Sequence, residues 1–317
     1  MTQYNRIELG KQAKELGFIR DTYEKVCRLS EILSFIENDS YLNTSLALKG
    51  GTAINLTIFD LPRLSVDIDL DFTHNISRNQ MIKAREIITE KFNIFMKNQG
   101  YLLDEKHVKN THALNSSVYS YTNAGGVYDR IKIEINYLLR EHILNPKIRQ
   151  IRTISGFTNA KILCLDPIEI YGAKITALIS RAAARDLYDV NNIFKSELFT
   201  CKDLDLLRKC VIFYKTINSD NAFDHLDISA IDKITFSKIR SDLFPVISSS
   251  EKKYNLPETV SFVKENLNNI LEMSTDEIRF VEHYFNKDLR PELLFDSDGI
   301  CQRIAKHPII EWKFSNL

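Results

Sequence analysis

An alternation of apolar and polar side chains marks residues 65–72, in the stretch SVDIDLDF. A period of two residues places the two classes on opposite faces of an extended chain, which predicts a half-buried strand. The acidic positions then share one face, where their like charges repel. The pattern therefore indicates either a solvated strand face or a site that holds a cation. The apolar set is Val66, Ile68, Leu70 and Phe72, and the polar set is Ser65, Asp67, Asp69 and Asp71.

Helical and strand patterns alternate around this segment in the first half of the chain. Apolar residues at helical spacing predict helices, and alternating runs next to glycine predict strands. Gly125-Gly126 is typical of a hairpin turn, and in the strand that follows, Glu134 shares a polar face opposite Ile133. The predicted elements are a helix over 18–36, a strand over 46–48, a short helix after Gly50-Gly51 with Thr52 as its cap, a helix over 78–97, and strands over 116–123 and 129–139.

The second half of the chain has a helical pattern. It begins after Asp166-Pro167, which fit the cap and the first residue of a helix. We therefore predict an α+β, bilobed protein with a mixed-sheet lobe over residues 1–160 and an all-helical lobe over residues 161–317.

Composition sets broad limits on partners and location. Lys+Arg and Asp+Glu are equal at 42 each in 317 residues, so the net charge gives no sign of nucleic-acid binding. No stretch has the roughly 18 apolar residues of a membrane helix, and the N-terminus lacks a signal-peptide core, so we expect a cytoplasmic protein without a membrane partner. Five cysteines without a C-x-x-C pair argue against a disulfide framework and a structural zinc site.

The acidic strand has the residue types of a divalent-cation site. Two aspartates separated by one residue can converge on two cations about 3.5–4 Å apart, and Mg²⁺ needs few protein carboxylates because water and phosphate complete its shell. We expect Asp67, Asp69 and Glu134 to bind two Mg²⁺ ions, with Mn²⁺ as an alternative metal. A calcium loop starting at Asp67 would need glycine and glutamate where the chain has Phe72 and Arg78. The alternative for a lone D-x-D is a solvated strand face.

The glycine turn before the acidic strand is a candidate phosphate site. Without a Cβ atom, Gly50 and Gly51 allow backbone N–H groups to approach a phosphate, and the helix start at Thr52 adds unpaired donors. Alone, the two glycines would indicate only a turn. The order of glycine turn, short helix, D-x-D strand and later acidic strand is more specific than any one of its parts.

A basic stripe is predicted on a later helix that runs through residues 167–194. At 100° per residue, Lys174, Arg181 and Arg185 lie along one line with Asp189, where the cations could bind nucleotide phosphates. The alternative is that Arg185 and Asp189 form an ordinary surface pair at i, i+4. Lys174 has no acidic neighbour on the predicted helix, so its partner must come from elsewhere.

Several stretches together resemble the AbiEii/AbiGii nucleotidyltransferase toxins, a branch of the DNA polymerase β-type superfamily. They are LALKGGTAI, RLSVDIDLDF, IKIEINY, IEIYGAKITALISRAAARDLYDV and a tail containing RPELLF and HPIIEWK. The resemblance implies an N-terminal polymerase β-like nucleotidyltransferase lobe and a helical C-terminal lobe. It also implies the toxin of a type IV toxin–antitoxin or abortive phage-defence system, with an antitoxin encoded nearby that need not contact the toxin.

The resemblance also assigns roles to single residues. Asp186 is the implied late acidic residue, although the helical wheel places it about 120° from Lys174, off the basic stripe. Asp71 is an extra acid that we expect to be solvated. The implied site is a phosphate-contacting turn at Gly51 and Thr52, a serine before the metal pair at Ser65, the metal pair Asp67 and Asp69, a phosphate contact at Lys174 and a third carboxylate at Glu134.

These residues predict nucleotidyl transfer from an NTP to an acceptor hydroxyl. One metal would lower the pKa of the attacking hydroxyl, and the other would hold the departing pyrophosphate. By resemblance, the acceptor is the 3′ end of a tRNA. Two alternatives stay open: an enzyme that transfers NMP to a protein hydroxyl, and a nucleotide-binding regulator without turnover, against which the intact aspartate pair argues.

Overall fold

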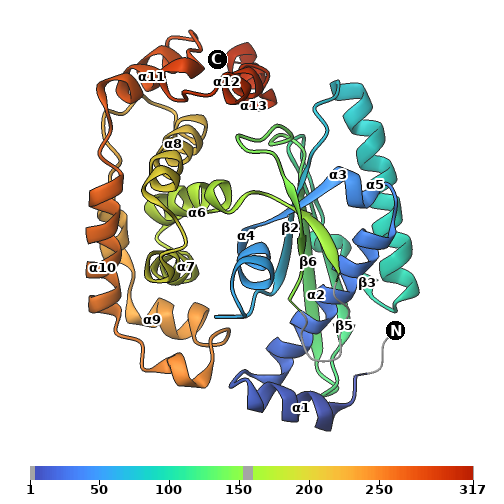
Figure 1. Cartoon of the computed structure of the whole chain (residues 1–317). Helices are drawn as coiled ribbons and strands as arrows, with labels where there is room; N and C mark the ends of the chain where they lie inside the picture. The colour runs from blue at the N-terminus through green and yellow to red at the C-terminus, as the bar shows by residue number, and fades with distance from the viewer. Residues whose placement is uncertain (1–3, 153–159, 317) are drawn as a thin grey trace. The chain divides into compact units, whose positions relative to one another are not determined.

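The computed structural model describes residues 4–152 and 160–316, and its chain divides into two compact units (Figure 1). The sheet unit contains Met1–Arg140, Pro146–Leu165 and Pro245–Lys252, and the helical unit contains Glu141–Asn145, Asp166–Phe244 and Lys253–Leu317. The predicted α+β class, with a mixed sheet and a helical C-terminal region, is confirmed. No helix in the described part of the chain is long and apolar enough to cross a membrane.

The sheet unit is built on one eight-stranded sheet in the order β3-β5-β6-β2-β1-β8-β7, with β4 paired to β5. The sheet is mixed, because β2 runs parallel to β6 but antiparallel to β1. The acidic strand β2 therefore lies inside the sheet, between two partners. The strands are β1 Leu46–Lys49, β2 Asp67–Phe72, β3 Leu102–Leu103, β4 Lys109–Asn110, β5 Leu114–Thr122, β6 Tyr128–Asn136, β7 Lys147–Gln150 and β8 Lys161–Cys164.

Helices α2 and α5 cover one face of this sheet (Figure 1). Ile68 and Ile133 on that face are at most 3% exposed, and the Tyr119 hydroxyl on β5 donates a 2.8 Å hydrogen bond to Asn93 Oδ1 on α5. The acidic side chains that alternate with these isoleucines on β2 and β6 therefore point to the opposite face of the sheet. The helices of the sheet unit are α1 Arg6–Glu15, α2 Arg20–Asn38, α3 Leu42–Ser45, α4 Gly50–Ala53 and α5 Arg78–Asn98, so both long predicted helices are confirmed.

The hairpin of β5 and β6, predicted from the glycine pair, is held at its turn by α2. Gly126 has φ of +80°, and the Glu24 carboxylate on α2 accepts a 2.8 Å hydrogen bond from Ala124 N. Arg28 on the same helix binds Glu24 at 2.7 Å, and both side chains are buried. A buried pair of this kind fixes geometry because neither charge can be left without the other. It holds the start of β6, the strand that carries Glu134.

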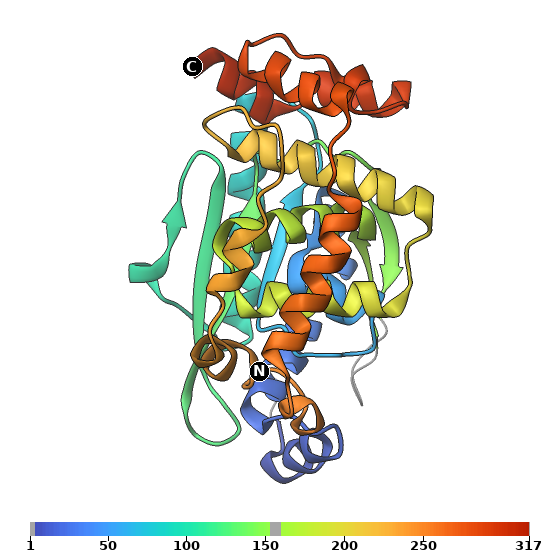
Figure 2. The ribbon, with the colours of Figure 1, turned by 90° about the vertical axis from the view of Figure 1, so that its left-hand side faces the viewer.

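The helical unit contains helices α6 to α13. Asp166 caps α6, accepting a 3.1 Å hydrogen bond from Ile168 N, and Pro167 is the first helical residue, as predicted. Figure 2 shows α11, α12 and α13 gathered on one side of α8. The helices are α6 Pro167–Arg181, α7 Ala184–Ser196, α8 Cys201–Asn218, α9 Phe236–Lys238, α10 Leu256–Ile270, α11 Thr275–Phe285, α12 Asp298–Ala305 and α13 Pro308–Asn316.

The prediction of one continuous helix through residues 167–194 is wrong. The helix ends at Arg181, and Ala182 adopts the left-handed conformation with φ of 50° and ψ of 52°. A second helix, α7, begins at Ala184. Alanine normally avoids this region at a cost of roughly 1–2 kcal/mol, so tertiary packing overrides the local preference. Ala182 and Ala184 are both buried, at 5% and 1% exposure.

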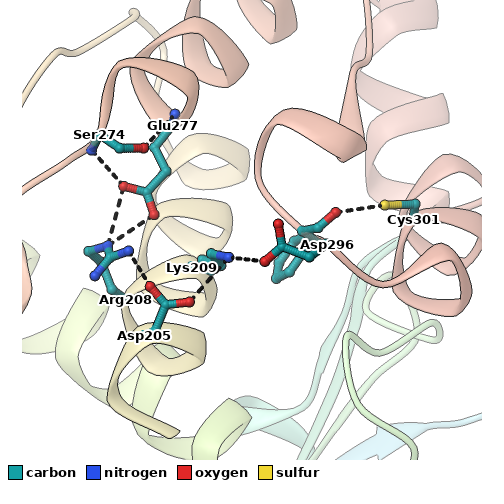
Figure 3. A network of polar contacts seen from close by, with 8 residues as sticks. Asp205, Arg208, Lys209, Ser274, Glu277, Asp296 and Cys301 are labelled. Atoms are coloured by element: carbon teal, nitrogen blue, oxygen red, sulfur yellow. Dashed lines mark hydrogen bonds and ion pairs between the residues drawn. The ribbon is translucent and has the colours of Figure 1, made fainter. Parts of the chain in front are cut away.

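A network of ion pairs joins α8 to α11 and to the segment after it (Figure 3). Arg208 on α8 donates to Glu277 at 2.9 Å and also pairs with Asp205, and Lys209 reaches Asp296 at 2.6 Å. Glu277 is 2% exposed and also belongs to the capping box that starts α11. Each charge in this network has an opposite charge beside it, which is typical of a structural cluster.

Candidate functional site

Three carboxylates lie in neighbouring strands, on the face of the sheet opposite α2 and α5. In the pairing of β2 with β6, Asp69 lies opposite Glu134 and Asp67 lies opposite Lys132. In the pairing of β1 with β2, Lys49 lies opposite Asp69. Directly paired residues project to the same face of a sheet. We call Asp67, Asp69, Asp71 and Glu134, together with Lys49 and Lys132, the carboxylate cluster.

The carboxylate cluster carries more negative than positive charge, because four acids face two lysines. Lys132 Nζ lies 2.8 Å from Glu134 Oε2, and Lys49 Nζ lies 2.5 Å from Asp71 Oδ1. Burial raises the pKa of the Asp69 carboxyl above its ordinary value; the Lys49 ammonium opposes this shift and the neighbouring carboxylates reinforce it. Burial is the largest single influence on Glu134 and acts to raise its pKa, but the hydrogen bond and charge of Lys132, with smaller contributions from Ser116 and Lys109, together outweigh it and the pKa is lowered. The cluster thus favours a bound cation.

Asp71 is not solvated, which corrects the expectation from the sequence. Its side chain is 2% exposed and is paired with Lys49 across β1 and β2. Because Lys49 belongs to a strand distant in sequence, the alternation of β2 alone could not reveal this pair. Asp71 is therefore a structural acid that holds the strand next to the glycine turn.

The glycine turn packs directly against Asp69. Gly50 has φ of +67°, and a Cβ atom built there would lie 2.5 Å from Asp69 Oδ2. At Gly51 a Cβ atom would lie 2.7 Å from Arg63 Nη2 and 3.0 Å from Ser65 Oγ. A Cβ atom at either position would therefore displace a side chain of the acidic strand or of its approach, and at Gly50 the positive φ adds backbone strain. The structure brings Gly50, Gly51 and Ser65 together with Asp69 within the sheet unit.

Thr52 is not the cap of the short helix, as the sequence had predicted. The helix begins at Gly50, and Ile54–Ile58 continue it as a π-helix. The Thr52 side chain is buried and donates a hydrogen bond to the carbonyl oxygen of Asp67. It therefore ties the turn to the first residue of β2, and its predicted role at a nucleotide stays a prediction.

A second group of charges, which we call the lysine cluster, lies in the helical unit and consists of Lys174, Arg181, Asp186 and Asp189. Lys174 Nζ lies 3.0 Å from Asp186 Oδ1 and 3.0 Å from Asp189 Oδ2. Arg181 Nη2 lies 2.8 Å from the other oxygen of Asp186. The side chains of Lys174, Asp186 and Asp189 are at most 10% exposed, whereas Arg181 is 65% exposed. Two cations and two anions balance here.

The lysine cluster corrects the predicted basic stripe and confirms that Lys174 takes its partner from outside its own helix. Because the chain breaks at Ala182, α7 turns Asp186 and Asp189 onto Lys174, so Asp186 is not remote from it as the continuous wheel implied. Arg185 lies elsewhere, and its Nε donates a 2.8 Å hydrogen bond to the carbonyl oxygen of Asp242. Arg185 therefore does not extend a line of cations from Lys174 and Arg181.

The fit of a metal rests on the two aspartates of β2. Among the described residues, no three His, Cys, Asp or Glu side chains are arranged as a ligand set, and Glu134 is held by Lys132. The predicted trio of Asp67, Asp69 and Glu134 is thus adjacent across the strands without forming a closed ligand shell. Mg²⁺ takes most of its ligands from water and phosphate, so the excess negative charge beside Asp67 and Asp69 fits this ion.

Sequence reasoning did not predict the contacts of three residues that shape these clusters. The alternation of β6 places Lys132 on the same strand face as Glu134, but the ion pair between them was not predicted, although the spacing alone could have indicated it. Lys49 ends the strand before the glycine turn, and only the pairing of β1 with β2 brings it to Asp69 and Asp71. Asp189 was assigned to Arg185, because the break at Ala182 has no sequence signal.

Comparisons with known proteins identify a family and a similar fold. The family model described as "Nucleotidyl transferase AbiEii toxin, Type IV TA system" matches residues 34–260. Among solved structures, the chain is similar to the nucleotidyltransferase toxin MenT4 from Mycobacterium tuberculosis, with a TM-score of 0.63 and 14% identity over 94% of this chain and 98% of that one. At this identity the similarity supports the fold alone. No curated protein sequence matches the chain.

Proposed function

Because the chain belongs to the AbiEii family of nucleotidyltransferase toxins of type IV toxin–antitoxin systems, we propose that it transfers NMP from an NTP to the 3′ end of a tRNA in a Mg²⁺-dependent reaction. One observation carries this proposal: Asp67 and Asp69 lie beside Glu134 on the sheet face opposite α2 and α5, and Asp69 packs directly against the glycine turn.

The residues of the carboxylate cluster have different roles in the proposed reaction. Asp67 and Asp69 would hold Mg²⁺, which supplies charge neutralisation for the phosphates and a lower pKa for the attacking hydroxyl. The missing Cβ atoms of Gly50 and Gly51 let the side chains of Asp69, Arg63 and Ser65 lie against the turn, whose backbone N–H groups would bind phosphate oxygens. Lys132 neutralises Glu134 until substrate arrives, and Glu134 would then orient or deprotonate the acceptor hydroxyl.

The lysine cluster has a different part in the proposal. The predicted phosphate contact of Lys174 stays a prediction, and Asp186 and Asp189 would hold its ammonium in a fixed position. Such a position costs little reorganisation when a phosphate binds. The exposed Arg181 is the better candidate of the two predicted arginines for a nucleotide, because Arg185 is held by the carbonyl of Asp242.

The family also implies a cognate antitoxin. We propose that this antitoxin counteracts the toxin without a required physical contact, and that expression of the toxin alone arrests growth. Replacement of Asp67 by asparagine should relieve the arrest. Growth curves with and without induction measure this effect, and undiminished toxicity of a well-expressed variant would contradict a catalytic role for the strand.

A labelling experiment tests the reaction and its acceptor. The purified protein is incubated with Mg²⁺, each α-labelled NTP in turn, and either total tRNA or lysate protein. We expect label in tRNA, and a loss of about a thousandfold for the Asp67→Asn/Asp69→Asn double variant, because the metals would lose both carboxylates. Omission of Mg²⁺ should have a similar effect.

A matched control is Asp60→Asn, which removes an aspartate of the same unit that is 78% exposed. It should transfer nucleotides at the wild-type rate. Label confined to protein would instead support the protein-directed alternative. Absence of label in both acceptors, with a folded protein that binds NTP, would contradict turnover altogether.

A further inference from the structure

The glycine turn and Glu134 lie on opposite sides of Asp69. In the sheet order, β2 lies between β1 and β6, so the turn that follows β1 and the carboxylate on β6 approach Asp69 from its two sides. The proposed function places the NTP phosphates at the glycine turn and gives Glu134 the acceptor hydroxyl. The acceptor must therefore leave the carboxylate cluster on the side of β6, over the strands β6, β5 and β4.

On that side the sheet presents cations and an aromatic ring. Every second residue of β6 projects to the face of Glu134, and the residues that precede Glu134 on this face are Tyr128, Arg130 and Lys132. Lys109 on β4 is paired with Ser116 on β5, which is paired with Glu134, so Lys109 also projects to this face. The name β6 surface is used below for Lys109, Tyr128, Arg130 and Lys132.

The β6 surface is accessible along its whole length. Tyr128 is 60% exposed, the side chains of Arg130 and Lys132 are 49% and 36% exposed, and Lys109 is exposed. At about 3.3 Å per residue, Lys132, Arg130 and Tyr128 lie roughly 7, 13 and 20 Å from Glu134 along the strand. Lys109 lies two strand spacings, roughly 10 Å, to the side of Glu134. The cations thus line a path from Glu134 to an exposed aromatic ring.

Ion pairing within the sheet is the simpler explanation for the two cations of β6. Arg130 Nη2 lies 3.2 Å from Asp104 Oδ2, and Lys132 is paired with Glu134 and lies opposite Asp67. This explanation does not account for the exposed cation Lys109 or for the exposed ring of Tyr128 at the start of the strand. Strand β5, which lies between β4 and β6, has no charged residue, so no acid of that strand offsets these cations.

We propose that the β6 surface binds the single-stranded 3′ end of the RNA acceptor, and this proposal rests on the proposed function. An RNA whose terminal hydroxyl lies at Glu134 continues outward as a polyanion, so Lys109, Arg130 and Lys132 would contact its phosphates and the Tyr128 ring would stack on a base. The pair with Asp104 does not prevent this, because a guanidinium has five N–H donors. Such contacts position the RNA without reading its sequence.

The test is the affinity of the full chain for tRNA, measured by fluorescence anisotropy at several salt concentrations. The variant Lys109→Gln/Arg130→Gln should bind about tenfold more weakly at 0.1 M salt. Its slope of log affinity against log salt should become shallower by about 1.4–1.8, because each lost phosphate contact removes roughly 0.7–0.9. Lys132 is left in place because it is paired with Glu134. Lys109→Gln alone keeps the pair of Arg130 with Asp104 and should give about half of the change in slope.

The aromatic contact has a different signature. Tyr128→Ala should bind tRNA at least about fivefold more weakly but with the wild-type salt slope, because a lost base stack changes no phosphate contact. Tyr128→Phe keeps the ring and should keep the wild-type affinity.

A matched control removes two exposed cations from α5, on the helix-covered side of the sheet: Lys83→Gln/Lys97→Gln. It should keep the wild-type affinity and slope. Equal losses in the two double variants, no loss in Lys109→Gln/Arg130→Gln, wild-type affinity of Tyr128→Ala, absence of tRNA binding by the wild type, or equal competition by duplex DNA would each overturn the proposal.

Nucleotide labelling is scored separately from binding. Transfer to tRNA by variants of the β6 surface that all keep the wild-type affinity would overturn this proposal and leave the proposed function intact. Binding of tRNA through the β6 surface without any transfer would contradict the proposed function and leave the RNA-binding surface in place.

Discussion

The carboxylate cluster and the lysine cluster contain similar side chains but differ in the balance of their positive and negative charges. In the carboxylate cluster, Asp69 is half-buried next to other acids, and the two lysines do not neutralise them all. In the lysine cluster, each buried aspartate lies 3.0 Å from Lys174, and Arg181 completes an equal count of charges. The comparison teaches that burial of charge alone does not distinguish a ligand site. The proposal of a metal site rests on the unbalanced charge of the carboxylate cluster next to the glycine turn.

The largest effect on stability should follow removal of the central cation of the balanced cluster. Lys174→Met leaves Asp186 and Asp189 buried without Lys174, and we expect a loss of about 3–5 kcal/mol in the free energy of unfolding. Urea denaturation measures it. The matched variant is Lys132→Met, where the lysine is 36% exposed, and its loss should be much smaller. Equal losses in the two variants would remove the distinction between the clusters.

A smaller effect is expected at the glycine turn of the carboxylate cluster. Gly50→Ala combines a left-handed backbone with a Cβ atom 2.5 Å from Asp69 Oδ2, so the carboxylate must move. We expect a loss of about 1–2 kcal/mol in stability and a larger loss in nucleotidyl transfer.

The control for this variant is Gly126→Ala, which has a similar φ of +80° and no atom within 4 Å of the new Cβ. It should lose only the stability that alanine costs in a left-handed backbone conformation, and it should keep full activity. If both glycine variants transferred nucleotides at the wild-type rate, the close approach of Gly50 to Asp69 would have no functional meaning.

The smallest effect, opposite in sign, is expected for Asp69→Asn in the absence of divalent cations. Burial raises the pKa of Asp69, so ionisation at neutral pH opposes folding. The variant should unfold at a higher temperature than the wild type at pH 7. This gain should shrink as the pH is lowered through the raised pKa toward the ordinary value near 3.8, below which the wild-type carboxyl is protonated in both states.

The comparison variant is Asp186→Asn in the balanced cluster. It removes a negative charge that Lys174 and Arg181 both contact, so it should lower the unfolding temperature at pH 7. Scanning calorimetry of both variants over a pH series separates the two signs. A destabilising Asp69→Asn at neutral pH would mean that the carboxylate cluster is balanced after all.

Local patterns predicted the elements but not the contacts between distant ones. The alternation around Ile68 identified β2 and its two faces, and Asp166-Pro167 identified the start of α6. The pair of Lys49 with Asp71 depends on strands that meet only in the fold. The break at Ala182 lies in a run of alanine and arginine, which are good helix formers, so only packing ends the helix there.

For the candidate site too, the sequence predicted the residues but not all of the contacts between distant elements. The acids of β2 and the glycines before it could be named from residue type and spacing, and the structure brings them together. Strands β7 and β8 were not predicted, because four-residue strands are too short for an alternation to stand out.

The return of residues 245–252 to the sheet unit limits how this protein can be dissected. Val246 O accepts a 2.7 Å hydrogen bond from Leu64 N, and Ile247 forms a bridge with Arg63, just before the acidic strand. A fragment truncated after Leu165 would lose both contacts and expose the approach to β2. A self-contained catalytic fragment would need residues 245–252 rejoined through an engineered linker.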